Sequence, residues 1–146
     1  MTDRKGIRPV KIESNLFDTI HIAVSGMKAT NRKMEVIGSN IANMQTTDTG
    51  NGQPYRRLTL EFKAEESKDG VHGVEVGELK QDPSDFQYIL DPGHPQADEN
   101  GYVAMPNVSW PREMIDLNIA SKAYQANAAI LKRYQKMIET SLELLR

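Results

Sequence analysis

Apolar residues between positions 16 and 43 recur at alternating spacings of three and four residues. This spacing, with no proline inside the stretch, predicts an amphipathic helix. A second row widens the apolar sector to about 160°, whereas a helix covered on one side needs roughly 100°. We therefore expect this helix to pack against more than one neighbour. The main row has apolar residues at seven of its eight positions, Thr30 being the exception: Leu16, Ile20, Ala23, Met27, Thr30, Met34, Ile37 and Ile41. The second row is Ile22, Ala29 and Val36.

A second helix with the same kind of pattern is predicted from Pro111 to Arg146. Proline is favoured in the first turn of a helix, and the apolar sector again spans about 160°. Polar residues such as Asn118, Gln125 and Lys132 occupy the opposite side. The apolar positions include Met114, Leu117, Ala123, Tyr124, Ala128, Ile130, Leu131, Met137, Ile138, Leu142, Leu144 and Leu145.

The period of the pattern changes to two in the middle of the chain, which predicts three to five short, half-buried strands. Leu58, Leu60 and Phe62 alternate with polar residues, and similar alternation follows at 74–76, 86–90 and 102–103. Asn100-Gly101 and the run from Asp91 to His94 are turn signals between these strands. The second fits a type II turn, in which Gly93 would have a positive φ.

These elements predict an α+β fold in which the long terminal helices pair, antiparallel, as a coiled coil and carry a small β-rich module at one end. The predicted domains are a basic, disordered extension (1–14), the paired helices (15–45 and 110–146) and the β-rich module (46–109). A contact of the basic extension with a partner is the alternative to disorder. Gly26 and Gly38 flank the main row of the first helix. These glycines either let another backbone approach closely or let the helix bend. The alternative is that the helix merely tolerates them.

Composition and charge exclude several classes of protein. The 146 residues fit one ordinary domain, and a net charge of −2 gives no reason to expect nucleic acid or an anionic membrane as a partner. Cysteine is absent, which excludes disulfides, thiolate catalysis and cysteine metal sites. No segment resembles a cleaved signal peptide or a transmembrane helix. These features alone give the cytoplasm as the default location.

The residues that could carry chemistry form no recognisable site. No two of His21, His72 and His94 have the spacing of a helical metal pair. His94 lies near several acidic residues that could hold a cation, although ordinary solvated turns have the same composition. No nucleophile elbow or phosphate-binding loop is present. We expect no catalytic residue, cofactor or metal, and the minority alternative is a metal-dependent enzyme around His94.

Short motifs at the helix ends and turns resemble those of the bacterial flagellar rod and hook proteins, the axial proteins of the flagellum. Ser39-Asn40-Ile41-Ala42-Asn43, followed by Thr46-Thr47, is similar to the N-terminal signature of that family. Ala120 to Asn127 is similar to its C-terminal helix motif. Further motifs narrow the resemblance to proximal rod members: Gly52 to Arg56, Asp91 to Pro95, Gly101-Tyr102-Val103 and Pro106-Asn107-Val108.

The resemblance implies a structural subunit of the basal-body proximal rod. Such a subunit polymerises through its terminal helices into the helical drive shaft that transmits torque for motility. It implies as partners further copies, other rod proteins, the adaptor to the membrane ring and the export apparatus, without direct membrane insertion. It places the chain in the periplasmic rod after type III export without a cleaved signal peptide, and so replaces the cytoplasmic default.

The resemblance makes the apolar rows an expected assembly interface, and it suggests that Asn40 and Asn43 form a joint between helix and β module. The alternative function is a stand-alone coiled-coil adaptor that binds a soluble partner. Two features depart from the family pattern: the 14-residue extension and the basic stretch from Leu131 to Gln135. The expected interface comprises Leu16, Ile20, Ala23, Met27, Met34, Ile37, Asn40, Ile41, Asn43, Leu117, Tyr124, Asn127, Leu131, Ile138, Leu142 and Leu145.

Overall fold

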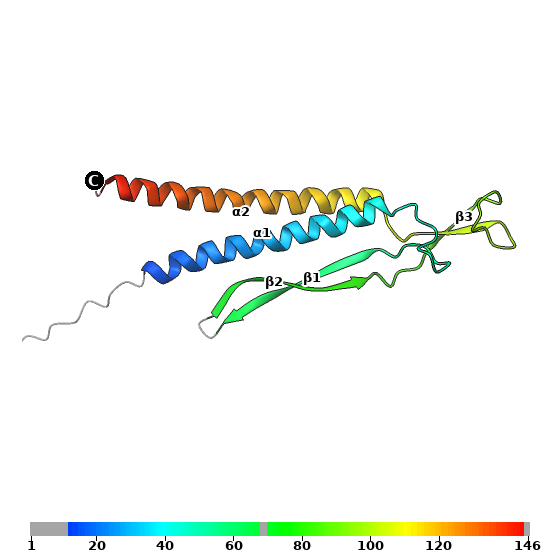
Figure 1. Cartoon of the computed structure of the whole chain (residues 1–146), viewed down its shortest axis with the longest axis horizontal. Coiled ribbons are helices and arrows are strands. Elements are labelled where there is room, and N and C mark those ends of the chain that lie inside the picture. Colours follow the sequence, from blue (N-terminus) through cyan, green and yellow to red (C-terminus); the bar gives the residue numbers. More distant parts are fainter. Residues whose placement is uncertain (1–11, 68–69, 145–146) are drawn as a thin grey trace, which may run out of the picture.

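The computed structural model describes residues 12–67 and 70–144, without the side chains of residues 12–16 and 66–72. It has two long helices and four strands (Figure 1). The first eleven residues of the predicted basic extension lie outside the described part of the chain. Its last three residues are helical, so the first helix begins earlier than the sequence pattern indicated.

Helices α1 (Ile12–Ala42) and α2 (Trp110–Leu144) lie side by side and run antiparallel. They are closest where α1 ends and α2 begins, and they diverge toward the chain termini (Figure 1). At the start of α2, the backbone N–H of Glu113 donates to the Ser109 carbonyl at 3.0 Å, and Pro111 occupies the first turn. The predicted α+β class and both predicted helices are confirmed.

The four strands form two separate two-stranded antiparallel sheets. Strands β1 (Leu58–Ser67) and β2 (Gly70–Gln81) form a long hairpin, and β3 (Gln87–Leu90) pairs with β4 (Tyr102–Met105). The number of strands agrees with the prediction. The position of the module at one end is right only for β3 and β4, because the β1–β2 hairpin folds back along α1 (Figure 1).

Helix α1 is the middle layer between α2 and the hairpin. Ala23 and Ile37, in the main apolar row, are buried, and so are Ala29 and Val36 in the second row. The second row is on the side from which Ser25 and Asn40 hydrogen-bond to the hairpin. The wide apolar sector of α1 therefore has two neighbours, as predicted, and both belong to the same chain.

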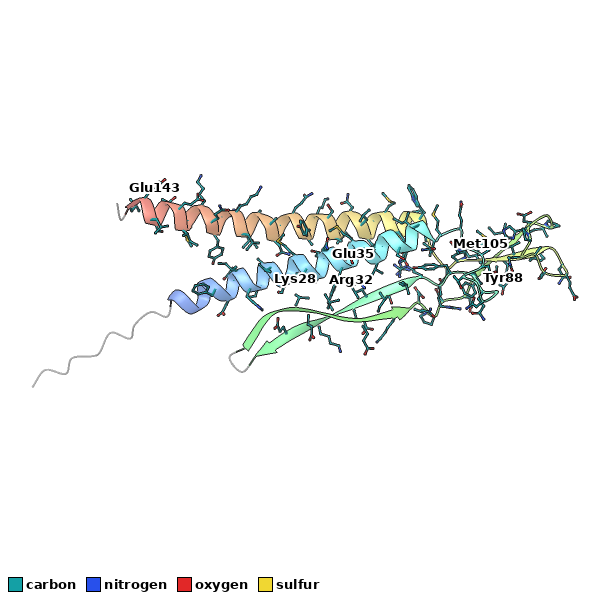
Figure 2. All side chains as sticks on the ribbon, viewed as in Figure 1. Lys28, Arg32, Glu35, Tyr88, Met105 and Glu143 are labelled. Carbon is teal, nitrogen blue, oxygen red and sulfur yellow. The ribbon has the colours of Figure 1, made fainter. Side chains whose placement is uncertain are left out.

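The remaining side of α1 is mostly polar, with the exposed Phe17 near the start of the helix as an exception. Lys28, Arg32 and Glu35 are exposed there, and Arg32 forms an ion pair with Glu35 at 2.7 Å (Figure 2). The two glycines of α1 differ in their surroundings. A Cβ on Gly26 would lie 2.8 Å from Nδ2 of Asn127, so this glycine permits the close approach of α2. A Cβ on Gly38 would meet no atom of the described chain within 4 Å.

Glycines in the β region explain one irregularity of the hairpin and correct one prediction. A Cβ on Gly77 would lie 2.9 Å from the Glu61 carbonyl oxygen, where the pairing register shifts. The N–H of His94 donates to the Asp91 carbonyl at 3.1 Å, which closes the predicted turn. Gly93 does not have a positive φ, so the type II assignment is wrong and the geometry fits type I. Gly101, in the loop before β4, does have a positive φ, at 80°.

The hydroxyl of Ser25 attaches the hairpin to α1, because it accepts a hydrogen bond from the Val74 N–H at 3.0 Å. We predict that Ser25→Ala lowers the free energy of unfolding by about 1–2 kcal/mol, since the Val74 N–H loses its partner. Chemical denaturation and amide exchange at Val74 measure this. Thr30→Val is the control, because the Thr30 hydroxyl bonds only to carbonyls of its own helix. Equal losses in both variants would contradict the prediction.

Candidate functional site

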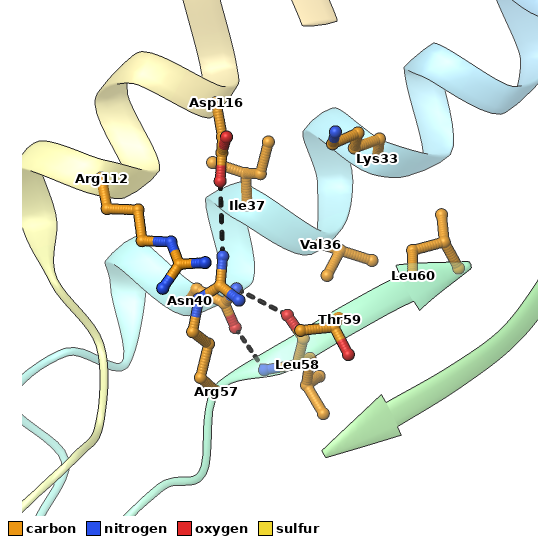
Figure 3. A pocket seen from close by; sticks show the side chains of 10 residues that line it. All are labelled: Lys33, Val36, Ile37, Asn40, Arg57, Leu58, Thr59, Leu60, Arg112 and Asp116. Carbon is orange, nitrogen blue, oxygen red and sulfur yellow. Dashed lines mark hydrogen bonds and ion pairs between the residues drawn. The ribbon is translucent and has the colours of Figure 1, made fainter. Parts of the chain in front are cut away.

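The side chain of Asn40, near the end of α1, binds the first residue of β1 at two points. Its Nδ2 donates to the Leu58 carbonyl at 2.9 Å, and its Oδ1 accepts from the Leu58 N–H at 2.9 Å (Figure 3). Oδ1 also accepts from the Tyr55 hydroxyl at 3.0 Å. Asn40 is only 1% exposed. A buried amide that makes all these bonds fixes the end of α1 against the start of β1.

Glu113 brings α2 to the same point. Its side chain is fully buried, its Oε2 accepts from Nδ2 of Asn40 at 3.2 Å, and its Oε1 accepts from Nε of Arg57. A buried carboxylate is tolerated only when it is paired and hydrogen-bonded. Here the partners come from α1 and from the residue before β1. The two helices and the hairpin therefore meet at one polar cluster, which we call the junction: Asn40, Tyr55, Arg57, Asp82, Glu113 and Asp116.

Arg57 is the only cation among the described residues of the junction, and three carboxylates surround it. Besides Glu113, it contacts Asp82 at 3.5 Å and Asp116 at 3.4 Å. Burial by itself would lower the pKa of Arg57, but the bond to Glu113 and the nearby carboxylates raise it above its usual value. Arg57 is therefore charged at every pH at which the protein is folded.

A second group of hydrogen bonds joins the segment after β2 to the segment after β4. Nδ2 of Asn107 donates to the carbonyls of Asp82 and Ser84, and its Oδ1 accepts from the Arg57 N–H at 2.7 Å. Arg56 donates to the same two carbonyls and stacks on Phe86, 4.2 Å from the ring centre. The Ser84 backbone N–H, together with Arg57, lowers the pKa of Asp82.

The end of α1 is closed by its own polar residues. Nδ2 of Asn43 donates to the Ser39 carbonyl at 2.9 Å, and Oδ1 of Asn43 accepts from the Thr46 hydroxyl. The Tyr55 N–H donates to the Thr46 carbonyl at 2.9 Å. The predicted joint is thus confirmed for Asn40, which connects helix to strand. Asn43 instead shapes the turn that returns the chain to Tyr55.

The junction holds both helices and the start of β1 together. A cavity of about 200 Å³ lies beside it, lined by residues that include Lys33, Leu60 and Arg112 (Figure 3). The carboxylates of the junction are bound to Arg57 or Asn40. Among the side chains that the structure describes, no group of three or more histidine, aspartate or glutamate residues could hold a metal ion. His94, the centre of the alternative metal site, accepts the Gln96 N–H at Nδ1 instead.

Comparison with known proteins finds family models and relatives that match this chain. Residues 20–48 match the family model "Flagella basal body rod protein", and residues 99–144 match "Flagellar basal body rod FlgEFG protein C-terminal". The chain is 38% identical to the flagellar basal-body rod protein FlgC of Agrobacterium fabrum, covering 86% of this chain and 91% of that one. It is 33% identical to FlgC of Bacillus subtilis, covering 88% and 97%, and 35% identical to FlgC of Salmonella typhimurium, covering 89% and 96%.

The chain belongs to the FlgC family of flagellar basal-body rod proteins. It is therefore a structural subunit of the bacterial flagellar rod, and the adaptor alternative is not favoured. The two family models cover most of α1 and the whole of β4 and α2, which include Asn40 and Glu113. No helix in the described part of this FlgC-family chain is long and apolar enough to cross a membrane.

The structure distributes the expected interface residues of this FlgC-family chain over three environments. Ala23, Ile37 and Asn40 are buried inside the subunit, so their contacts here are intramolecular. Ile138 and Leu142 are exposed. The side chain of Leu16 and all of Leu145 lie outside the described part. The rest are half-buried, and their role in assembly stays a prediction: Ile20, Met27, Met34, Ile41, Asn43, Leu117, Tyr124, Asn127 and Leu131.

Sequence reasoning missed Arg57 and Glu113. Arg57 follows another arginine at the start of a strand, and Glu113 is in the first turn of a helix, where acidic residues are common on the surface. Both positions therefore favour a solvated side chain. Only the three-dimensional arrangement shows that the two residues are partners, because 56 positions separate them in the chain.

Replacement of Asn40 by aspartate keeps the shape of the side chain but removes both N–H donors and places a carboxylate beside Glu113. We predict that Asn40→Asp lowers the free energy of unfolding by about 3–5 kcal/mol, as expected for an unpaired buried charge. Asn43→Asp is the matched control, since its side chain is partly exposed, and it should cost clearly less. Urea denaturation of the two variants measures the difference, and similar values would argue against the junction.

The neighbouring arginines allow a second test. Arg57→Lys keeps the charge but replaces three guanidinium nitrogens, each of which contacts a different carboxylate, with a single nitrogen. It should therefore lose at least one charged hydrogen bond, worth about 1.5–3 kcal/mol. Arg56→Lys should cost about 1 kcal/mol or less, mainly from lost stacking on Phe86. Thermal unfolding of both variants at neutral pH checks the order, and a larger loss for Arg56→Lys would refute the assignment.

Proposed function

We propose that this subunit polymerises through its terminal helices into the helical drive shaft of the proximal rod. One observation carries the proposal: α2 has an apolar row that no described part of the chain covers. Ile119, in the middle of this row, is 56% exposed. The spacings of four and seven residues place the row on one side of the helix. The exposed row is Ile115, Ile119, Ala126, Ile130, Met137 and Leu144.

The exposed row is distinct from the surface that α2 turns toward α1. Ala120 is buried, and Asn127 lies against Gly26. Leu131 and Tyr124 line a hollow with Met27 and Val24 of α1. A continuous apolar row opposite a neighbour-facing side is typical of protein interaction surfaces. In a rod subunit, the natural neighbours are the helices of adjacent subunits.

Assembly would also complete the pairing of α1 and α2. The helices diverge toward the chain termini, where Ile138 and Leu142 remain exposed (Figure 1). We propose that neighbouring helices fill this space and that the terminal helices form coiled-coil contacts in the rod. Head-to-tail contacts of this kind need not close, and they therefore generate a filament instead of a ring of fixed size.

The junction supports a role in transmitting torque. It connects both helices to the hairpin through buried hydrogen bonds and ion pairs, so that the parts of the subunit move together under load. We propose that the drive shaft transmits torque through such rigid subunits and is required for motility. Because the FlgC relatives are named as rod proteins, we propose a structural role without catalytic activity.

Partners and location follow from the same proposal. We infer contacts with further copies, with other rod proteins and with the adaptor between the rod and the membrane ring. The subunit would reach the periplasmic part of the basal body through the flagellar type III export apparatus. Membership of a rod protein family supports these partners, and none of them requires insertion into a membrane.

The exposed row of α2 provides the test. We predict that Ile119→Asp abolishes rod assembly and swimming, because a charge replaces the apolar centre of the interface, while the circular dichroism and stability of the monomer hardly change. Asn118→Asp adds the same charge one residue away on the polar side, so it leaves the apolar row intact and rods should still assemble. Basal bodies isolated from cells that carry each variant, together with motility in soft agar, give the readout. Normal rods with Ile119→Asp would overturn the proposal.

A further inference from the structure

Although the net charge of the chain is only −2, its acidic and basic residues are separated along its length. Residues 81–111 contain five acidic residues and no lysine or arginine, whereas residues 117–138 contain four basic residues and no aspartate or glutamate. The first segment includes β3 and β4 at one end of the molecule, and the second belongs to α2. Tyr88 and Met105 mark the β end, and Glu143 marks the far end of α2 (Figure 2).

The acidic surface is built by loops around β3 and β4, and we call it the acidic tip. Gln96 donates to Oδ2 of Asp48 at 3.2 Å, which ties the loop after α1 to the loop between β3 and β4. The carboxylates of the tip are all exposed, and none of them forms an ion pair with a described residue. The acidic tip consists of Asp48, Asp91, Asp98 and Glu99.

The acidic tip surrounds apolar side chains. Tyr88 is 66% exposed, and Ile89 and Leu90 beside it are also exposed. A hollow of about 290 Å³ is lined in part by Ile89, by Met105 and by Asp91 of the acidic tip. Apolar centres with a charged rim are typical of protein interfaces.

The basic surface covers the side of α2 that faces away from α1, and we call it the basic face. Its residues are Lys122, Lys132, Arg133 and Lys136, all of them exposed. Their spacings place them on one side of the helix, next to the exposed apolar row. None of them forms an ion pair in the part of the chain that the structure describes. Lys132 and Arg133 of the basic stretch from Leu131 to Gln135 therefore lie on an accessible surface.

We propose that the acidic tip of one subunit contacts the basic face of a neighbouring copy. Charge complementarity selects this occupant, because the chain carries both partners and they lie too far apart to meet within one molecule (Figure 1). The contact joins different surfaces of the two copies, so it repeats without closing. The inference rests on the proposed function, since it concerns how copies are oriented within the rod.

A charge-swap experiment with the full-length chain tests the contact. Reversal of the basic face (Lys132→Glu with Arg133→Glu) or of the tip (Asp91→Lys with Glu99→Lys) should weaken self-association by about tenfold or more at low salt. The chain with all four substitutions should regain affinity to within about threefold of the native chain. Sedimentation velocity at several salt concentrations measures this. Lys28→Glu with Lys63→Glu is the control for the reversal of the basic face. It changes the net charge by the same amount, but on α1 and β1.

A cross-linking experiment adds a direct measure, because the chain has no cysteine. A mixture of the Glu99→Cys and Lys132→Cys variants should form a mixed disulfide dimer faster than a mixture of Glu99→Cys and Lys28→Cys. The same pairs can be tested in assembled basal bodies.

Three results would overturn the contact: a native chain that stays monomeric at low salt, a charge swap that fails to restore association, or cross-linking at equal rates. The outcomes for this contact and for the proposed function can be separated. If the swap fails while Ile119→Asp still blocks assembly, only the charged contact is wrong. If Ile119→Asp assembles normally, the helix-based function is wrong, whatever the swap shows.

Discussion

The ion pair between Arg57 and Glu113 is the interaction on which the arrangement of the subunit depends. A buried pair contributes little net stability, because removing both charges from water costs about as much as their attraction returns. Its effect is selective, since either charge left alone would be strongly unfavourable. The pair and its partner Asn40 form only when the end of α1, the start of β1 and the start of α2 meet. Misplacement of any one of them leaves a buried charge unpaired.

Local pattern predicted the elements well and their arrangement only in part. Helical spacing found α1 and α2, and alternation found every strand, because each of these signals lies within a few neighbouring residues. The direction of the β1–β2 hairpin could not be predicted, since it depends on the bond between Ser25 and Val74, which are 49 positions apart. The residue types of the turn predict type II, but Gly93 does not have the positive φ that type II requires. Glycine allows both signs of φ, so residue type alone does not decide the turn type.

The two helices show what the width of an apolar sector can and cannot reveal. Both sectors are about equally wide in the sequence, which correctly indicated more than one neighbour for α1. The pattern alone does not identify these neighbours. In α1 the hairpin covers the second row, so that Ala29 and Val36 are buried within the subunit. In α2 the corresponding row remains exposed, so it is available to other subunits.

Apolar rows and charged surfaces have different consequences for an assembly. Burial of an apolar row favours association but distinguishes poorly between registers, because a helix that slides by seven residues presents a similar surface. Charges at fixed positions penalise the wrong registers, since like charges then meet. In this subunit the exposed row and the basic face are adjacent on α2. The same helix can thus supply affinity from one side and orientation from the other, which a shaft built from repeated copies requires.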